Sequence, residues 1–146
     1  MKTAADILKA KPHAQVYSIW PGATVLEALT LMAEKGVGAL VVMEGEQLAG
    51  IISERDYARK VVLMERSSYN TEVSEIMSAD VITVSPATSN EACMQLMTDK
   101  RLRHLPVVDN GRLVGLISIG DLVKDIISDQ QSMIRTLESY IRGETA

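Results

Sequence analysis

Short apolar runs alternate with amphipathic stretches along this chain of 146 residues. Two pairs of apolar runs stand out, one at residues 39–43 and 48–52 and one at residues 105–108 and 113–117. A polar turn joins each pair, and in the second pair it is Asn110-Gly111, which readily adopts the positive φ angles of a two-residue hairpin turn. Each pair therefore predicts a β-hairpin.

Apolar residues at helical spacing flank these hairpins and predict helices over residues 24–35, 54–65, 88–102 and 121–143. Capping boxes fit the starts of two of them, at Thr24 with Glu27 and at Thr88 with Glu91, and Ser128 with Gln131 could restart the last one. Shorter patterns predict a lead-in helix and a strand before each hairpin unit, at 3–11 with 16–19 and at 73–77 with 81–84. Each unit would then have its own lead-in helix.

The second half of the chain repeats the first. At an offset of 65 residues the two halves match without a gap at Pro86 and Pro21, Leu105 and Leu40, Gly115 and Gly50, Ser118 and Ser53, and Asp121 and Asp56. A repeat of this length indicates one supersecondary unit used twice, each copy burying a face against the other. We expect an α/β (α+β) fold of two pseudo-symmetric repeats, at residues 5–66 and 71–125, each a small sheet with flanking helices, and a C-terminal helical tail at 126–146.

The repeated motifs resemble those of the cystathionine β-synthase (CBS) domain, a regulatory module that binds adenine nucleotides. They are Gly50-Ile51-Ile52-Ser53-Glu54-Arg55-Asp56, Gly115-Leu116-Ile117-Ser118-Ile119-Gly120-Asp121 and Arg103-His104-Leu105-Pro106-Val107-Val108. The resemblance covers residues 5 to 125 and implies a stand-alone tandem CBS pair. It further implies that AMP, ATP or NAD binds in the cleft between the repeats, that the chain forms a homodimer, and that it signals occupancy to an unidentified regulated protein.

The Ser-x-x-Asp spacing can be read in two ways. It is a helix cap when taken singly, but two copies at one offset favour a binding role. A helix N-terminus attracts anions, so the turns after Ser53 and Ser118 predict phosphate sites, and the carboxylates of Asp56 and Asp121 suit the vicinal diol of a ribose. The resemblance implies the same contacts and places adenine among strand residues of a site that includes Ala39, Ile82, Thr83 and Pro106.

Cationic residues lie close to both motifs. Arg55 could reach a phosphate or could lie on a solvated helix face, whereas Arg103 and His104, next to a buried-looking strand, favour phosphate contact. The copies differ here, because Arg103-His104 replaces Gly38-Ala39 and Ile119-Gly120 replaces Glu54-Arg55. We expect two unequal sites, although the sequence leaves open which wall faces which cleft.

Composition excludes several other functions. A net charge of −4 and 3% aromatic residues argue against nucleic-acid binding. The apolar runs are far shorter than the ~20 residues needed to span a bilayer, and the N-terminus lacks the apolar core of a signal peptide, so we expect a cytoplasmic protein without a membrane partner. The single cysteine, Cys93, excludes an internal disulfide.

Motifs for catalysis are missing from the sequence. It has no nucleophile elbow, phosphate-binding loop or metal-ligand spacing, so we predict neither an enzyme nor a catalytic cofactor or metal. The predicted function is an adenine-nucleotide sensor, and the alternatives are a ligand-free dimerisation module and a small nucleotide hydrolase. The apolar stripe of the tail must pack on its own domain or on a second copy.

Overall fold

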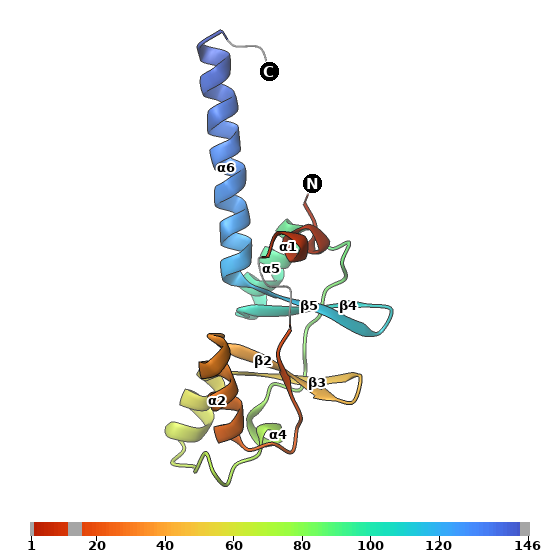
Figure 1. The fold of residues 1–146 in the computed structure, drawn as a ribbon, viewed down its shortest axis with the longest axis vertical. Helices are drawn as coiled ribbons and strands as arrows, with labels where there is room; N and C mark the ends of the chain where they lie inside the picture. The colour runs from red at the N-terminus through yellow and green to blue at the C-terminus, as the bar shows by residue number, and fades with distance from the viewer. Residues whose placement is uncertain (1, 12–15, 144–146) are drawn as a thin grey trace.

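The computed structural model describes residues 2–11 and 16–143 and contains two small β-sheets with helices around them (Figure 1). Each repeat supplies one sheet, and the long helix α6 (Ile119–Ile141) follows the second and projects away from the rest of the molecule. The predicted mixed α/β fold with two repeats and a C-terminal helix is confirmed.

The two hairpins share one register. The first sheet has the strand order β1-β2-β3, and the second sheet has the order β4-β5, with bounds Ser18–Ile19, Ala39–Glu44, Gln47–Ser53, His104–Asp109 and Arg112–Ser118. Leu40 lies opposite Ile52, and Leu105 lies opposite Ile117 at the same offset of 65. Asn110 and Gly111 adopt φ angles of 52° and 80°, as the hairpin turn requires.

The repeat extends to irregular features of the sheets. Each hairpin has a register shift at the same point, between Val42 and Met43 in one and between Val107 and Val108 in the other. Strand β1 pairs with β2 in parallel, and the second copy of this pairing is reduced to one parallel bridge between Val84 and Val107. The same backbone geometry has therefore been built twice.

The remaining helices are α1, α2, α3 continuing into the π-helical turn η1, α4 and α5, with bounds Ala4–Ala10, Val25–Lys35, Glu54–Tyr57, Ala58–Val62, Val73–Ile76 and Asn90–Lys100. Thr24 and Glu27 form the predicted capping box of α2. The predicted box at Thr88 is wrong: Ser89 caps α5 by accepting from the Ala92 N–H at 3.1 Å, while the Thr88 hydroxyl accepts from the Ser85 N–H.

The lead-in helices pack on the opposite repeats, so the expectation that each serves its own is wrong. Ala4 and Ile7 of α1 belong to the core of the second repeat, and Val73 and Ile76 of α4 belong to the core of the first. Backbone hydrogen bonds fix this exchange, with the Ala4 N–H donating to the Thr88 carbonyl at 2.8 Å. Each core therefore needs a segment from the other half of the chain.

Helix α6 is continuous for 23 residues, without a restart at Ser128. Leu122 in its first turns is buried, whereas the apolar residues further along the helix are exposed. Among the described residues, no helix combines the length and apolar character needed to cross a membrane.

Candidate ligand pocket between the repeats

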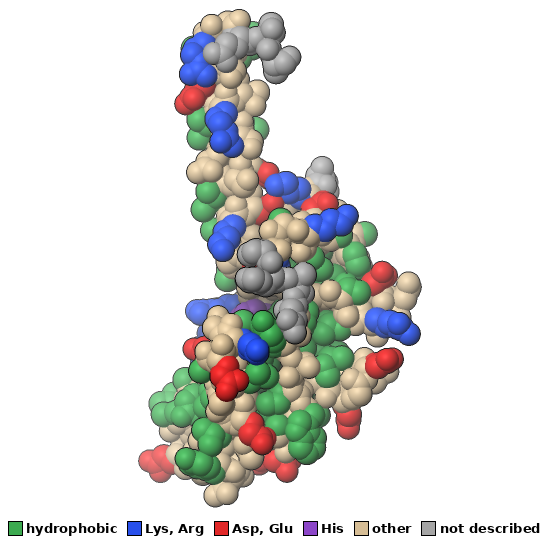
Figure 2. Space-filling model, in the orientation of Figure 1, with side chains coloured by type: hydrophobic (Ala, Val, Ile, Leu, Met, Phe, Trp, Pro, Cys, Tyr) green, Lys and Arg blue, Asp and Glu red, His purple; other side chains and the backbone are tan. Residues whose placement is uncertain are grey.

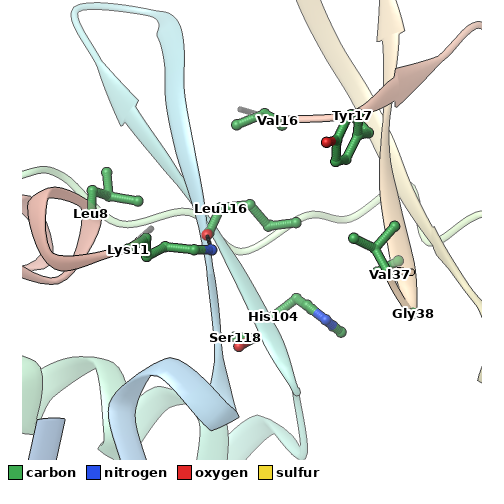
Figure 3. A pocket seen from close by; sticks show the side chains of 10 residues that line it. Leu8, Lys11, Val16, Tyr17, Val37, Gly38, His104, Leu116 and Ser118 are labelled. Atoms are coloured by element: carbon green, nitrogen blue, oxygen red, sulfur yellow. Dashed lines mark hydrogen bonds between the residues drawn. The ribbon is translucent and has the colours of Figure 1, made fainter. Parts of the chain in front are cut away.

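A pocket of about 320 Å³ lies between the two repeats (Figure 3). Its walls come from the end of α1, from the segments leading into β1 and β2, and from β4 and β5. The lining residues are Leu8, Lys11, Val16, Tyr17, Val37, Gly38, Ala39, His104, Leu116 and Ser118. One part of the lining is apolar, whereas Lys11, His104 and Ser118 supply polar groups, the combination typical of small-molecule sites.

Ser118 and Asp121 form the cap of α6 at the edge of this pocket. The Asp121 carboxylate accepts from the Ser118 N–H at 2.9 Å, and the Asp121 N–H donates to the Ser118 hydroxyl at 3.2 Å. The Ile119 N–H donates to the Arg103 carbonyl at 2.9 Å. Since these bonds engage two of the first three N–H groups of α6, less of the helix N-terminus is available to an anion than the motif alone indicates.

Lys11 adds a cation that sequence reasoning missed. Its ammonium nitrogen lies 3.0 Å from the Asp121 carboxylate and donates to the Leu116 carbonyl at 2.8 Å (Figure 3). It reaches the second repeat only because α1 packs there, and it stands outside the repeated motifs. No local signal in the sequence could have identified it.

Burial and neighbouring charges set the protonation of this corner. Burial raises the pKa of the Asp121 carboxyl, but the Ser118 N–H and the Lys11 ammonium lower it more, so the net pKa lies below the ordinary 3.8. The stability that this carboxylate contributes is therefore fully present above pH 3.8 and is lost as the pH falls further. Burial also lowers the pKa of His104 below 6.5, against the opposing effect of Asp121, so the imidazole is neutral at pH 7.

The first copy repeats the cap with different surroundings. Asp56 accepts from the Ser53 N–H at 2.9 Å and from the Ser53 hydroxyl at 3.0 Å. Its nearby cation is Lys60 of the same helical segment, 3.5 Å away, which also donates to the Ile76 carbonyl at 2.9 Å. Asp56 therefore lacks a cation delivered from the opposite half of the chain in the way that α1 delivers Lys11 to Asp121.

The predicted site residues divide into two groups. Ala39, His104 and Ser118 line the pocket, and Asp121 joins it through Lys11. The rest of the predicted set does not line this pocket: Ser53, Arg55, Asp56, Ile82, Thr83, Arg103 and Pro106.

The repeat offset accounts for this division. Applied to Ile82 it gives Tyr17, and applied to Arg103 it gives Gly38, and both of these residues line the pocket. The predicted set thus combined positions that are related by the pseudo-symmetry and lie on different walls. The wall at Gly38 and Ala39 faces Ser118 of the other repeat, which answers what the sequence left open.

Gly50 and Gly115 make room for side chains of the exchanged segments. A Cβ on Gly115 would lie 2.6 Å from a methyl carbon of Leu8, and one on Gly50 would lie 2.7 Å from the sulfur of Met77. These glycines are therefore required by the packing of the lead-in segments on the opposite repeats.

Comparisons with known proteins agree over nearly the whole chain. The family model of the CBS domain matches residues 3–63 and 73–128. Among curated proteins, the chain is 42% identical to the CBS domain-containing protein CBSX3, mitochondrial, of Arabidopsis thaliana, over 97% of this chain and 72% of that protein. It is 36% identical to the CBS domain-containing protein YhcV of Bacillus subtilis, over 81% of this chain and 84% of that protein.

Solved structures show the same likeness. A protein of Burkholderia ambifaria described as a signal-transduction protein with CBS domains is 58% identical, with a TM-score of 0.85 over 88% of this chain and 96% of that one. A hexameric CBS-CP12 protein from bloom-forming cyanobacteria is 28% identical, with a TM-score of 0.74 over 92% of this chain and 86% of that one. Sequence and backbone thus agree across both repeats.

Proposed function

The chain belongs to the CBS-domain family, and from this premise we propose that it is a regulatory module that binds an adenine nucleotide in the pocket between its repeats. The observation that carries the proposal is the pocket lining, which combines an apolar wall with Lys11, His104 and Ser118 beside the Asp121 carboxylate. A volume of about 320 Å³ is within the range of small-molecule sites.

Each part of a nucleotide has a matching group in this proposal. The base packs among Val16, Tyr17, Val37 and Leu116, and the ribose diol donates to Asp121, whose ionised form offers two acceptor oxygens. The phosphate is held chiefly by the Lys11 ammonium, because much of the α6 N-terminus is engaged in capping. Gly38 leaves space on the opposite wall.

Binding transmits a signal by shifting populations. A ligand that contacts both repeats stabilises the relative arrangement of repeats for which it has the higher affinity. A regulated protein that distinguishes the two arrangements then senses occupancy. This proposal requires binding without chemical turnover, so incubation with ATP, AMP or NAD should leave each compound unchanged, whereas turnover would favour the hydrolase alternative.

Adenine nucleotides should raise the melting temperature more than guanine nucleotides. A ligand at about 100 times its Kd stabilises a fold by about 2.7 kcal/mol, which corresponds to about 5 to 10 °C for a chain of this size. Thermal melts with AMP, ATP, NAD and GMP test this prediction. A melting temperature that no adenine compound changes, together with mass spectra that show no co-purified nucleotide, would support the ligand-free alternative.

The two repeats should bind ligands unequally. Arg103 occupies the position equivalent to Gly38 of the described pocket, so the second cleft has a bulkier and more cationic wall. Titration calorimetry with AMP and with NAD at low and high salt should resolve two classes of site, and Arg103→Ala should weaken one and leave the other intact. Two equal sites that the substitution leaves unchanged would contradict this inequality.

We also propose that the working form is a homodimer, which the solved hexameric relative supports by showing that a protein with this fold can self-associate. The cytoplasmic location predicted from the sequence stays a prediction, since the Arabidopsis relative is named as mitochondrial.

A further inference from the structure

The outer face of α6 carries an apolar stripe with a seven-residue period. The stripe consists of three columns that begin at Val123, Ile126 and Ile127 and recur every seven residues as far as Ile141. Gln130 is the one member with an amide side chain. Exposure is high throughout, from 41% at Ile126 to 82% at Ile141, and Figure 2 shows hydrophobic side chains along α6 where it rises above the body.

The body of the protein packs on a different face of α6. Leu122 is buried there, and Lys2 forms ion pairs with Asp125 and Asp129, each at 2.7 Å. These three positions lie on the side of the helix away from the stripe, because each residue advances about 100° around the axis. The body therefore holds the first half of α6 by one face and leaves the stripe exposed.

A seven-residue apolar period is the pattern of helices that pair with other helices. Neighbouring columns at this spacing form a continuous seam when two helices supercoil about each other, and a single polar residue within the seam fixes the register. Column members that match one another in kind, such as Ile127, Ile134 and Ile141, suit an identical helix as the partner.

The charges beside the stripe determine the orientation of such a pair. Lys124 and Glu138 lie 14 residues apart, two heptads, and so occupy the same side of the stripe. In an antiparallel pair centred between Gln131 and Ser132, Lys124 of each helix lies opposite Glu138 of the other. The same register places Ile126 opposite Leu137. An antiparallel arrangement also aligns the helix dipoles favourably.

We propose that α6 forms an antiparallel pair with α6 of a second copy of this chain through the apolar stripe. This inference assigns a surface and an orientation to the homodimer proposed above. The two bodies then lie at opposite ends of the paired helices, and each ligand pocket stays at a distance from the seam.

Light scattering of the full chain tests the surface. The chain should be a dimer at micromolar concentration, and Ile134→Asp should raise the dimer dissociation constant at least tenfold, because it places a charge in the seam. Ser132→Asp, on the same helix outside the stripe, is the matched control and should leave that constant unchanged. Since Ile134 is exposed in the monomer, circular dichroism should show that both variants fold.

The outcomes separate this inference from the homodimer itself. A monomeric chain overturns both, whereas a dimer that Ile134→Asp leaves intact overturns only the α6 pair and places the homodimer contact elsewhere.

Cysteine cross-linking tests the orientation in a Cys93→Ser background. Ile126→Cys mixed with Leu137→Cys should form a disulfide between the two variants, and neither variant alone should cross-link to itself. Self-cross-linking of Ile126→Cys would show a parallel pair and overturn the proposed orientation. Charge reversal gives a second readout: Lys124→Glu and Glu138→Lys should each weaken the dimer, and the double variant should restore it.

Discussion

Asp121→Ala should lower the affinity of the pocket for AMP about ten- to hundred-fold. The substitution removes an ionised hydrogen-bond acceptor, whose loss costs about 1.5 to 3 kcal/mol. Two effects contribute here, because the carboxylate is the proposed ribose contact and also fixes Lys11 at 3.0 Å beside the pocket. Titration calorimetry at constant salt measures the change, and thermal melts of the free protein show how much stability the lost cap costs.

Two variants separate the ribose contact from capping. Asp121→Asn keeps an oxygen that can accept from the Ser118 N–H but loses the charge that Lys11 and a diol require, so it should preserve the fold better than it preserves affinity. Asp56→Ala is the matched control, since Asp56 has the same cap geometry in the first copy and lies outside the described pocket. AMP affinity that neither Asp121→Ala nor Asp56→Ala alters would rule out the ribose assignment.

Local features of the fold could be predicted from the sequence. The apolar runs and the Asn110-Gly111 turn determine the hairpins through interactions between near neighbours, and the offset of 65 carries over to the pairing of Leu105 with Ile117. The Ser-x-x-Asp motifs likewise predicted the capping boxes, because a helix start is fixed within a few residues.

Features that depend on distant segments could not be predicted. The sequence contains similar apolar stripes in α1 and α4 and does not say which core each one enters, so the exchange between repeats was missed. Lys11 was missed for the same reason, because its contact with Asp121 joins residues 110 positions apart. The site suffered most from this, since three of the four pocket residues from α1 and the segment leading into β1 (Leu8, Val16 and Tyr17) are apolar and carry no motif.

The exchange itself makes a testable difference between two equivalent glycines. Gly115→Ala should destabilise the fold by about 1 kcal/mol, because the new methyl group meets only the end of the flexible Leu8 side chain. Gly50→Ala should cost more, about 2 to 3 kcal/mol, because its methyl group would also lie 2.8 Å from the Ser78 carbonyl oxygen. Thermal or urea unfolding of the two variants measures this difference.

Second substitutions identify the obstructing group in each case. Leu8→Ala should relieve part of the cost of Gly115→Ala, measured against Leu8→Ala alone in a double-mutant cycle. Met77→Ala should not rescue Gly50→Ala, because Ser78 and Ile51 exchange two backbone hydrogen bonds, of 2.9 and 3.1 Å, that hold the carbonyl in place. Equal costs at the two glycines, or rescue by Met77→Ala, would mean that the segment after α4 yields as readily as the Leu8 side chain. In that case the backbone bridge at Ile51 would not be what fixes α4 on the first repeat.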